Sequence, residues 1–502
     1  MRGFNQLVKQ GKLEYVENLK SKLIKISLKN DSYKGNNNDF EELCLQQFLT
    51  YRLLDKKFSE EILKSIKDGK KLNIILPHKW RIFLDKEGFK VNTFQNKLNW
   101  LSFELFYFFY GLSFGLIEFF NSFFRKKILG DYIYLYDLNE RNFPRSKEDM
   151  ATNNFVNWFI KSGYTKKNNH IVHSAKIRFN KICGVKLTKS MGPLPPLSGY
   201  SRIYFLFWLV GIFFIGLISQ RTRILLKEKV LLKILELCPK ENLANAYYFP
   251  SPWAVFKPLW TYEAERLGKE VVLYLYSTNI YKLIAKGKDE SFYYNYWRTN
   301  QWKKFMVWNS SQKIYLKSKI RNEAKIDVVG PIPFFSSKHN FNMDISHYKR
   351  KILVFDVQPF RRSHYTSLGP YVDFYNYKNG VKFLSDINLI AKDLEAKVFI
   401  KRKRNTIYTS KGYLSFISNL VQKEKWIELD ADFDAFSVSK YLNPNISINM
   451  PFTSTANVTS HYKIPSVYYD SLNQLESSKF SFLDIKLISN YKELKNWANS
   501  NI

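Results

Sequence analysis

The chain has 502 residues, of which 45% are hydrophobic and 17% aromatic, so it can bury more than one core and is not intrinsically disordered. Its formal net charge of +34 favours an anionic partner, such as a phosphorylated substrate, an anionic membrane surface or nucleic acid. The three cysteines are far apart and lack CxxC spacing, which predicts reduced thiols in a cytoplasmic setting.

Residues 100–124 (WLSFELFYFFYGLSFGLIEFFNSFF) are more apolar than an ordinary soluble helix. At helical spacing the few polar and small residues fall on one face, and the other faces are almost wholly Leu, Phe and Ile. We expect that stripe to pack on protein, with its two glycines allowing close helix approach. The residues of the stripe are Glu104, Tyr107, Gly111, Gly115 and Glu118.

Residues 203–219 (IYFLFWLVGIFFIGLIS) form a second apolar segment, uncharged and flanked by Arg202, Arg221 and Arg223. It is at the short end of the roughly 17–25 residues that span a bilayer. Because basic residues flank both ends, their distribution does not indicate which end of the segment would face the cytoplasm. This symmetry favours a monotopic or re-entrant insertion over a complete crossing of the membrane. The alternative for both segments is a buried core helix.

The rest of the N-terminal portion predicts mixed α/β structure. Strands are expected at residues 72–78 and 132–138, in the run HIVHSA, before Pro250 and at 271–276, with a helix before the last of them. Such β-α-β units build parallel sheets. His170 and His173 would point to opposite faces of their strand, so no metal site is expected.

The C-terminal portion alternates strands and helices more regularly. Apolar strands are expected at residues 352–355 and 398–400, from Trp426, and in the runs ISINM and SVYYD, with helices between them. This order predicts a doubly wound parallel sheet, whose ligands bind outside the carboxyl ends of the strands. We therefore expect an N-terminal domain at residues 1–345 carrying the apolar helices and a C-terminal nucleotide-binding domain at 346–502.

The chemically suggestive residues of this half follow its strands. They are Gln358, Arg361 and Arg362 after the first strand, Lys401 and Lys403 in a basic run after the second, and Thr453, Ser454 and Thr455 before a helix. Helix N-termini bind phosphate through free N–H groups, so the three groups together predict a phosphate site. Each also has an ordinary explanation, namely a solvated charge run for the lysines and a helix N-cap for Ser454 or Thr455.

The run DADFD places aspartates at 430, 432 and 434 between a strand and a helix. Its position favours helix capping over metal binding, and no metal or other cofactor is expected.

The stretch INMPFTSTANVTSHYKIPSVYYD resembles the signature of bacterial polysaccharide-biosynthesis proteins named for a PFTS motif, here Pro451, Phe452, Thr453 and Ser454. The C-terminal third is similar to the nucleotide-binding half of GT-B glycosyltransferases. In groups that use CMP-sugars, a His-Pro motif and a Ser/Thr motif hold the nucleotide. This chain has the second but carries IKRKRN in place of the first, so CMP, UDP and GDP donors all stay open.

The resemblance implies a GT-B-like α/β chain with two Rossmann-type domains. It further implies a glycosyltransferase that moves a sugar from a nucleotide-sugar to a lipid-linked or growing glycan of the cell surface, at the cytoplasmic face of the inner membrane. A carboxylate or histidine must take the acceptor proton; the candidates are Asp373, His364, Glu263 and Glu265. The alternatives are an epimerase-like enzyme on the same fold, a membrane scaffold, and a nucleic-acid-binding protein, which lacks a motif here and is not expected.

Overall fold

The computed structural model describes residues 12–27, 37–54, 56–69, 71–128, 130–144, 153–165, 169–278, 280–281, 283–288, 297, 299–320, 323–335, 343–359, 374–402 and 409–502. Five of the predicted site residues lie outside these ranges, namely Arg361, Arg362, His364, Asp373 and Lys403.

The N-terminal half is built on an eight-stranded sheet with the order β10-β9-β8-β7-β3-β4-β6-β5, hereafter the N-sheet. All neighbouring pairs are parallel except β5–β6. The strands are β3 (Ile133–Leu135), β4 (His170–His173), β5 (Lys181–Ile182), β6 (Val185–Lys189), β7 (Ala246–Pro250), β8 (Glu270–Tyr274), β9 (Lys304–Val307) and β10 (Lys325–Val328). The helices around this sheet include α7 (Phe155–Lys161), α10 (Leu259–Arg266) and α12 (Ser310–Lys319).

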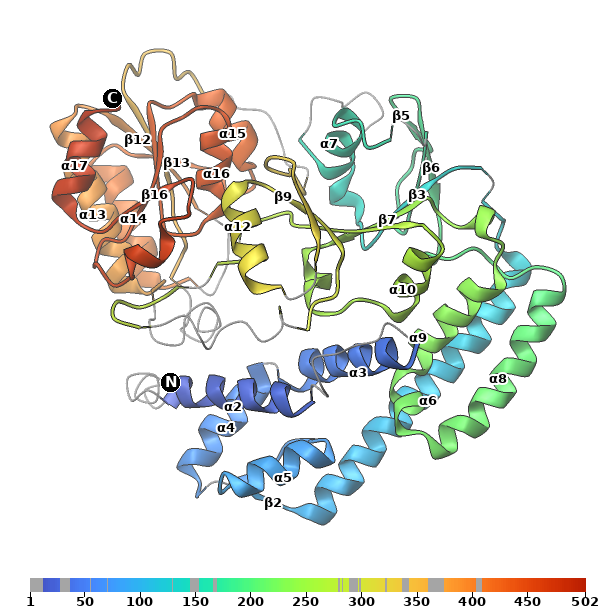
Figure 1. The fold of residues 1–502 in the computed structure, drawn as a ribbon. Helices are drawn as coiled ribbons and strands as arrows, with labels where there is room; N and C mark the ends of the chain where they lie inside the picture. Colours follow the sequence, from blue (N-terminus) through green and yellow to red (C-terminus); the bar gives the residue numbers. More distant parts are fainter. Residues whose placement is uncertain are drawn as a thin grey trace.

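The C-terminal half holds a six-stranded, all-parallel sheet with the order β13-β12-β11-β14-β15-β16, hereafter the C-sheet. Its strands are β11 (Lys351–Phe355), β12 (Lys397–Lys401), β13 (Ile427–Leu429), β14 (Ile446–Asn449), β15 (Ser466–Tyr469) and β16 (Lys486–Ile488). Both faces of a parallel sheet must be covered, and here helices lie on each side (Figure 1). These helices are α13 (Tyr377–Asp393), α14 (Lys411–Lys423), α15 (Ala435–Leu442), α16 (Ser454–His461) and α17 (Tyr491–Asn499).

Two parallel, Rossmann-type sheets in one α/β chain confirm the predicted fold class. The domain boundary predicted at residue 345 falls between β10 and β11 and stays a prediction. The strand predicted at residues 72–78 is wrong beyond Leu72. There β1 (Lys71–Leu72) pairs only with β2 (Lys90–Val91), and a helix begins at His78.

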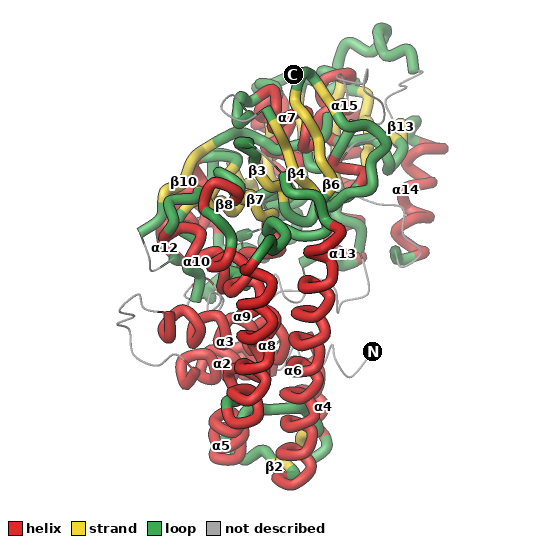
Figure 2. Tube along the Cα trace, turned by 90° about the vertical axis from the view of Figure 1, so that its right-hand side faces the viewer, coloured by secondary structure: helices red, strands yellow, loops and turns green. Residues whose placement is uncertain are grey.

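The apolar segments form a three-helix layer below the N-sheet (Figures 1 and 2). Its members are α6 (Thr93–Phe124), α8 (Tyr200–Ile218) and α9 (Gln220–Leu237), and α8 runs antiparallel to α9, since Ser201 Oγ near the start of α8 donates to the carbonyl of Leu237 at the end of α9 (3.1 Å). Smaller helices pack beside α6 and α9 around a separate apolar cluster, namely α2 (Lys12–Ser27), α3 (Asn37–Leu53), α4 (Lys56–Lys67) and α5 (His78–Lys86).

The polar stripe predicted on α6 faces protein, as expected. A Cβ on Gly111 would lie 2.6 Å from Leu226 Cβ of α9, and one on Gly115 would lie 2.8 Å from Leu209 Cδ1 of α8. Glu104, which is buried, forms an ion pair with Arg223 (2.6 Å). The glycines therefore bring the three helices together, and the charge on the stripe is neutralised inside the layer.

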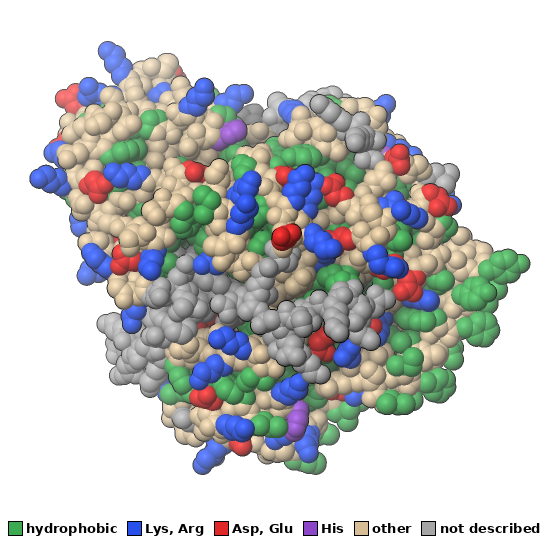
Figure 3. Space-filling model, viewed as in Figure 1, with side chains coloured by type: hydrophobic (Ala, Val, Ile, Leu, Met, Phe, Trp, Pro, Cys, Tyr) green, Lys and Arg blue, Asp and Glu red, His purple; other side chains and the backbone are tan. Residues whose placement is uncertain are grey.

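The outer faces of α6 and α8 are apolar and uncovered. Both helices are long and apolar enough to cross a membrane by length and composition. Phe124 and Ile218 are 85% and 89% exposed, and Phe207 is 73% exposed. Figure 3 shows hydrophobic side chains gathered over α8. An exposed apolar surface of this kind marks an interaction site in a folded protein.

The two halves are joined through their cores. Tyr281, in the stretch after β8, contacts the ring of Phe452 in the C-terminal half (6.0 Å between centroids). Next to it, Ala285 forms an antiparallel bridge with Leu475. A single apolar cluster includes strand residues of both sheets, so the carboxyl ends of the N-sheet are held against the C-terminal half.

Candidate functional site

The chain order of the C-sheet reverses direction between β11 and β14. From β11 the chain moves to β12 and β13 on one side, then returns to build β14, β15 and β16 on the other. In the register Phe355 of β11 lies beside Lys401 on one neighbour and Asn449 on the other, so all three strands end together. This topological switch point is where doubly wound sheets bind ligands.

The PFTS motif forms a tight turn directly after β14. The Thr453 N–H donates to the carbonyl of Met450 (3.3 Å), Pro451 sits at the second position of the turn, and Phe452 has φ +62° at the third. This is the pattern of a type II turn, with phenylalanine where glycine is usual. Phe452 is buried, and its ring packs on Phe480 (4.7 Å between centroids). The packing of the Phe452 side chain thus stabilises a left-handed backbone conformation that is unfavourable for a non-glycine residue. Backbone strain of this kind is frequent at functional sites.

The three hydroxyls of the motif have different partners. Thr453 Oγ1 donates to the Met450 carbonyl (2.9 Å), and Thr455 Oγ1 donates to Asn449 Oδ1 (3.0 Å). Ser454 Oγ accepts from both the N–H (2.9 Å) and the hydroxyl (3.1 Å) of Thr278, in the loop after β8 of the N-sheet. The motif therefore lies where the two halves meet.

Neither Ser454 nor Thr455 caps the helix, as the alternative explanation required. The N-cap of α16 is Thr453, and no side-chain cap bond is made there by the described residues. The first N–H groups of α16 are therefore open at the switch point, where the helix dipole favours an anion.

Gln358 lies on the other side of the switch point, three residues after β11. Its side chain is 0% exposed, and within the described part of the chain neither amide atom has a hydrogen-bond partner. A buried, unpaired amide is costly unless a ligand or water completes it. Nearby, Tyr413 donates its hydroxyl to Asp356 Oδ2 (2.9 Å).

Lys401 is also at this edge but is turned toward the loop after β13. Its Nζ donates to the carbonyls of Arg402 and Ala431 (3.2 Å each). Burial lowers its pKa, and the charges of Asp356 and the DADFD run oppose that shift. Asp434 accepts from the Ser437 N–H (2.8 Å) as the N-cap of α15, which confirms the capping role predicted for this run. No cluster of metal-ligating side chains occurs among the described residues.

The base candidates on α10 are both engaged in ion pairs. Glu263 pairs with Arg266 (2.6 Å), and Glu265 pairs with the fully buried Lys257 (2.7 Å), whose pKa burial lowers to about 8. The strand histidines are separate: burial lowers the pKa of His173 to about 4, and His170 Nε2 contacts Thr188 Oγ1 (2.8 Å).

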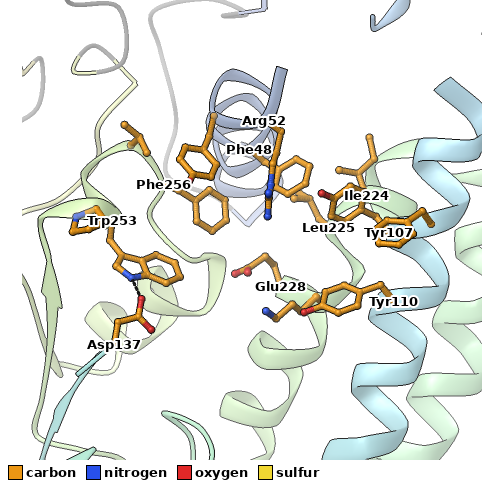
Figure 4. Close-up of a pocket in the computed structure, with 15 residues that line it drawn as sticks. Phe48, Arg52, Tyr107, Tyr110, Asp137, Ile224, Leu225, Glu228, Trp253 and Phe256 are labelled. Carbon is orange, nitrogen blue, oxygen red and sulfur yellow. Dashed lines mark hydrogen bonds between the residues drawn. The ribbon is translucent and has the colours of Figure 1, made fainter. Parts of the chain in front are cut away.

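A cavity of about 580 Å³, hereafter the aromatic cavity, lies at the carboxyl ends of β3 and β7 (Figure 4). It is lined by Phe48, Tyr51 and Arg52 of α3, Phe106, Tyr107 and Tyr110 of α6, Ile224, Leu225, Lys227 and Glu228 of α9, and Asp137, Pro252, Trp253, Val255 and Phe256 after the two strands.

Two carboxylates in the aromatic cavity were missed by sequence reasoning. Trp253 Nε1 donates to Asp137 Oδ2 (2.5 Å), and the Leu259 N–H donates to Glu228 Oε2 (3.0 Å). Desolvation by the surrounding side chains raises the pKa of both, and in each case the charge of Lys227 opposes the shift. A signal existed for Asp137, which lies at the carboxyl end of the strand expected at 132–138, but none marked Glu228 inside an amphipathic helix.

No curated protein sequence matches the chain. Among solved structures, Arabidopsis thaliana UGT89C1 complexed with UDP-L-rhamnose is similar, with 10% identity and a TM-score of 0.39 over 75% of this chain and 90% of that one. So is Methanocaldococcus jannaschii UDP-GlcNAc 2-epimerase in complex with UDP-GlcNAc and UDP, with 11% identity and a TM-score of 0.34 over 74% and 92%.

A family model gives the stronger result. The model described as "Polysaccharide biosynthesis PFTS motif protein" matches residues 207–498, which include α9, strands β7 to β10 of the N-sheet, the whole C-sheet and the PFTS turn. The match covers more than half of the chain. The protein therefore belongs to the family of polysaccharide biosynthesis PFTS motif proteins.

Proposed function

We propose that this protein is a glycosyltransferase that takes a sugar from a nucleotide-sugar bound at the switch point of the C-sheet. The observation that carries the proposal is the pairing of a buried, unpartnered Gln358 with the uncapped N-terminus of α16. The amide suits the hydrogen-bonding edge of a base or sugar, and the N–H groups suit the phosphate. Further positive charge for the phosphate would come from Arg361, Arg362, Lys401 and Lys403. The loop that presents the N–H groups contains Thr453, Ser454 and Thr455.

Catalysis in this proposal is electrostatic. When the bond between the sugar and the nucleotide breaks, negative charge develops on the leaving phosphate. N–H groups fixed at the start of α16 would stabilise that charge without a metal ion, because they are already aimed by the strained turn at Phe452. The family adds the setting, since its members act in polysaccharide biosynthesis.

We further propose that the protein works at the cytoplasmic face of the inner membrane, with α6 and α8 inserted from one side. Three observations support monotopic insertion. The outer faces of both helices are apolar. The neighbouring helix α9 carries charged residues such as Arg221 and Lys229. The first residues of α8 lie beside the last residues of α9, so both ends of the α8–α9 hairpin are on the same side. A charged helix returning beside α8 makes a complete crossing unfavourable.

The donor proposal is tested by thermal shift and calorimetry against CMP-, UDP- and GDP-sugars. We expect one class to bind, and Gln358→Leu to weaken its binding by about 0.5–1.5 kcal/mol for each lost neutral hydrogen bond, with little loss of fold stability. Ser415→Ala on the outer face of α14 is the control, since Ser415 is exposed and bonds only within its helix. Binding that is unaffected by Gln358→Leu would move the donor elsewhere, and no binding by any class would end the transferase proposal.

The membrane proposal is tested by fractionation. We expect the protein to sediment with membranes, to stay there in high salt and to require detergent for extraction. Complete release by salt alone would leave only electrostatic adhesion.

A further inference from the structure

The aromatic cavity lies on the edge of the N-sheet that meets the PFTS turn. Thr278, which bonds Ser454, follows β8, and Asp137 follows β3. In the sheet β7 separates these two strands, so their ends are two strand spacings apart, about 10 Å. The aromatic cavity and the PFTS turn therefore lie at the same edge of the N-sheet.

One wall of the aromatic cavity belongs to the exposed apolar surface. Phe106 and Tyr110 of α6 line the cavity and are 64% and 45% exposed. They lie one helical turn apart on the outward side of α6, which continues into the uncovered faces described above. A hydrocarbon chain resting on that surface can enter the cavity without crossing a polar boundary.

Two cations belong to the lining of the aromatic cavity, the exposed Arg52 and the half-buried Lys227. Arg52 lies over the rings of Phe48 (5.9 Å) and Tyr51 (5.6 Å), and Lys227 lies over that of Tyr110 (5.5 Å). Among the described residues neither cation forms an ion pair within 4.0 Å. The charge of Lys227 also acts on Asp137 and Glu228, although it forms no direct ion pair with either. Cations that are flanked by rings and lack a direct ion pair suit a phosphate attached to a lipid.

The carboxylates differ in how they are held. Glu228 is half-buried and accepts from the first N–H of α10, so its role is to cap that helix. Asp137 is fixed by the Trp253 indole through one oxygen, and its side chain stays partly open to the cavity. An oriented carboxylate with one oxygen available is what a general base requires.

From these observations we propose that the aromatic cavity binds the acceptor, a sugar carried on a lipid phosphate, and that Asp137 takes the proton from its attacking hydroxyl. This inference rests on the proposed function and adds the acceptor class and the base to it. In the step, the acceptor oxygen bonds to the anomeric carbon of the donor sugar and the bond from that carbon to the nucleotide phosphate breaks. The nucleotide leaves with the electron pair, and the hydroxyl proton moves to the Asp137 carboxylate.

Acceptor binding is tested on the full chain in detergent micelles, with farnesyl diphosphate as the probe and with farnesol and inorganic diphosphate as its two halves. We expect farnesyl diphosphate to bind more tightly than either half. Arg52→Gln and Lys227→Gln should each raise its Kd about tenfold or more, the effect of losing a charged hydrogen bond. Lys233→Gln is the matched control on α9, because Lys233 pairs with Glu236 and lies outside the cavity.

Each other outcome overturns the acceptor site. Equal affinity for inorganic diphosphate would make it a general anion site, and equal affinity for farnesol would make it an apolar patch. The donor proposal has its own readout. If the protein binds a nucleotide-sugar but not farnesyl diphosphate, the transferase proposal stands and the acceptor site is wrong. If it binds farnesyl diphosphate but no nucleotide-sugar, the transferase proposal is wrong and the cavity is a lipid-phosphate site.

The base is tested by transfer of radiolabelled sugar from the donor class that binds into the organic-extractable lipid of membranes. Asp137→Asn should lower the rate by a hundredfold or more while the Kd for farnesyl diphosphate is unchanged. A base acts only when it is deprotonated, and the pKa of Asp137 is raised. The wild-type rate should therefore rise with pH at values above those at which an ordinary aspartate loses its proton, and the Asp137→Asn variant should not show this rise. Asp131→Asn, which bonds Asn245 outside the cavity, is the control. A rate that falls with Glu228→Gln and not with Asp137→Asn would overturn the assignment.

Discussion

Ser454 joins the two halves through a single oxygen atom. Its hydroxyl accepts from the backbone N–H and the side chain of Thr278, which is 0% exposed. We predict that Ser454→Ala lowers the free energy of unfolding by about 1–3 kcal/mol, because the buried N–H loses its acceptor. Urea unfolding at equilibrium measures the change.

Thr278→Ala gives the matched comparison for that bond. It removes only the hydroxyl and keeps the N–H donor to Ser454, so we expect a smaller loss of stability than in Ser454→Ala. Equal losses in the two variants would mean that the backbone bond contributes little. A loss of transferase rate in Ser454→Ala that exceeds its loss of stability would return Ser454 to the phosphate role suggested by the sequence.

Sequence reasoning at this scale succeeds where the partner is local. Asp434 caps α15 three residues ahead of its partner, and this was predictable from a polar residue before a helix. The bond from Thr278 to Ser454 spans 176 residues, and no local pattern encodes it. Asp137 and Trp253 are likewise 116 residues apart, so the aromatic cavity appears only when five separate segments come together.

Among the elements, α6 depends on its glycines. A Cβ at Gly111 would lie 2.6 Å from Leu226 Cβ and 2.8 Å from the backbone nitrogen of Lys227. The backbone atom cannot move aside, so we predict that Gly111→Ala costs about 1–3 kcal/mol of stability through overpacking. Thermal unfolding in detergent measures this.

Gly211→Ala on α8 provides the opposite case. Nothing lies within 4 Å of its Cβ position, so alanine should be neutral or add about 0.5–1 kcal/mol through its higher helix propensity. If Gly111→Ala behaves like Gly211→Ala, then α6 and α9 are not closely packed in solution.

β11, β12 and β14 were predicted correctly because burial on both faces leaves each of them a nearly continuous apolar run. Edge strand β16 has an exposed and a half-buried residue among its three, and β9 begins at a lysine, so neither carries a clear periodic signal. The strand expected at residues 72–78 fails because Pro77 leads into a helix that begins at His78, and pairing ends after Leu72.

For the whole molecule, the shared core predicts cooperative behaviour. Tyr281 packs on Phe452 of the C-terminal half, and Ala285 forms a backbone bridge with Leu475 in the same apolar cluster. Domains with a large apolar interface do not move or unfold independently. We predict one unfolding transition for the two sheets, with coincident midpoints.

Single-tryptophan deletions can separate the two halves in that experiment. Trp302 is buried beside β9 and Trp426 beside β13, so Trp302→Phe and Trp426→Phe each remove one reporter. Fluorescence-detected urea curves of both variants should share a midpoint after correction for stability. Two resolved midpoints would show that the halves are separate cooperative units.

The hydrogen bond between Ser201 and Leu237 has a consequence for how the chain reaches its place in the cell. Under the monotopic insertion proposed above, with the two ends of the α8–α9 hairpin held together, no loop is carried through the bilayer, and the polypeptide can be completed and folded in water before it meets lipid. Attachment is then a partition equilibrium set by the apolar area of α6 and α8. A protein attached in this way would exchange between membranes, and its amount on any one of them would follow lipid composition and not the capacity of a translocation channel.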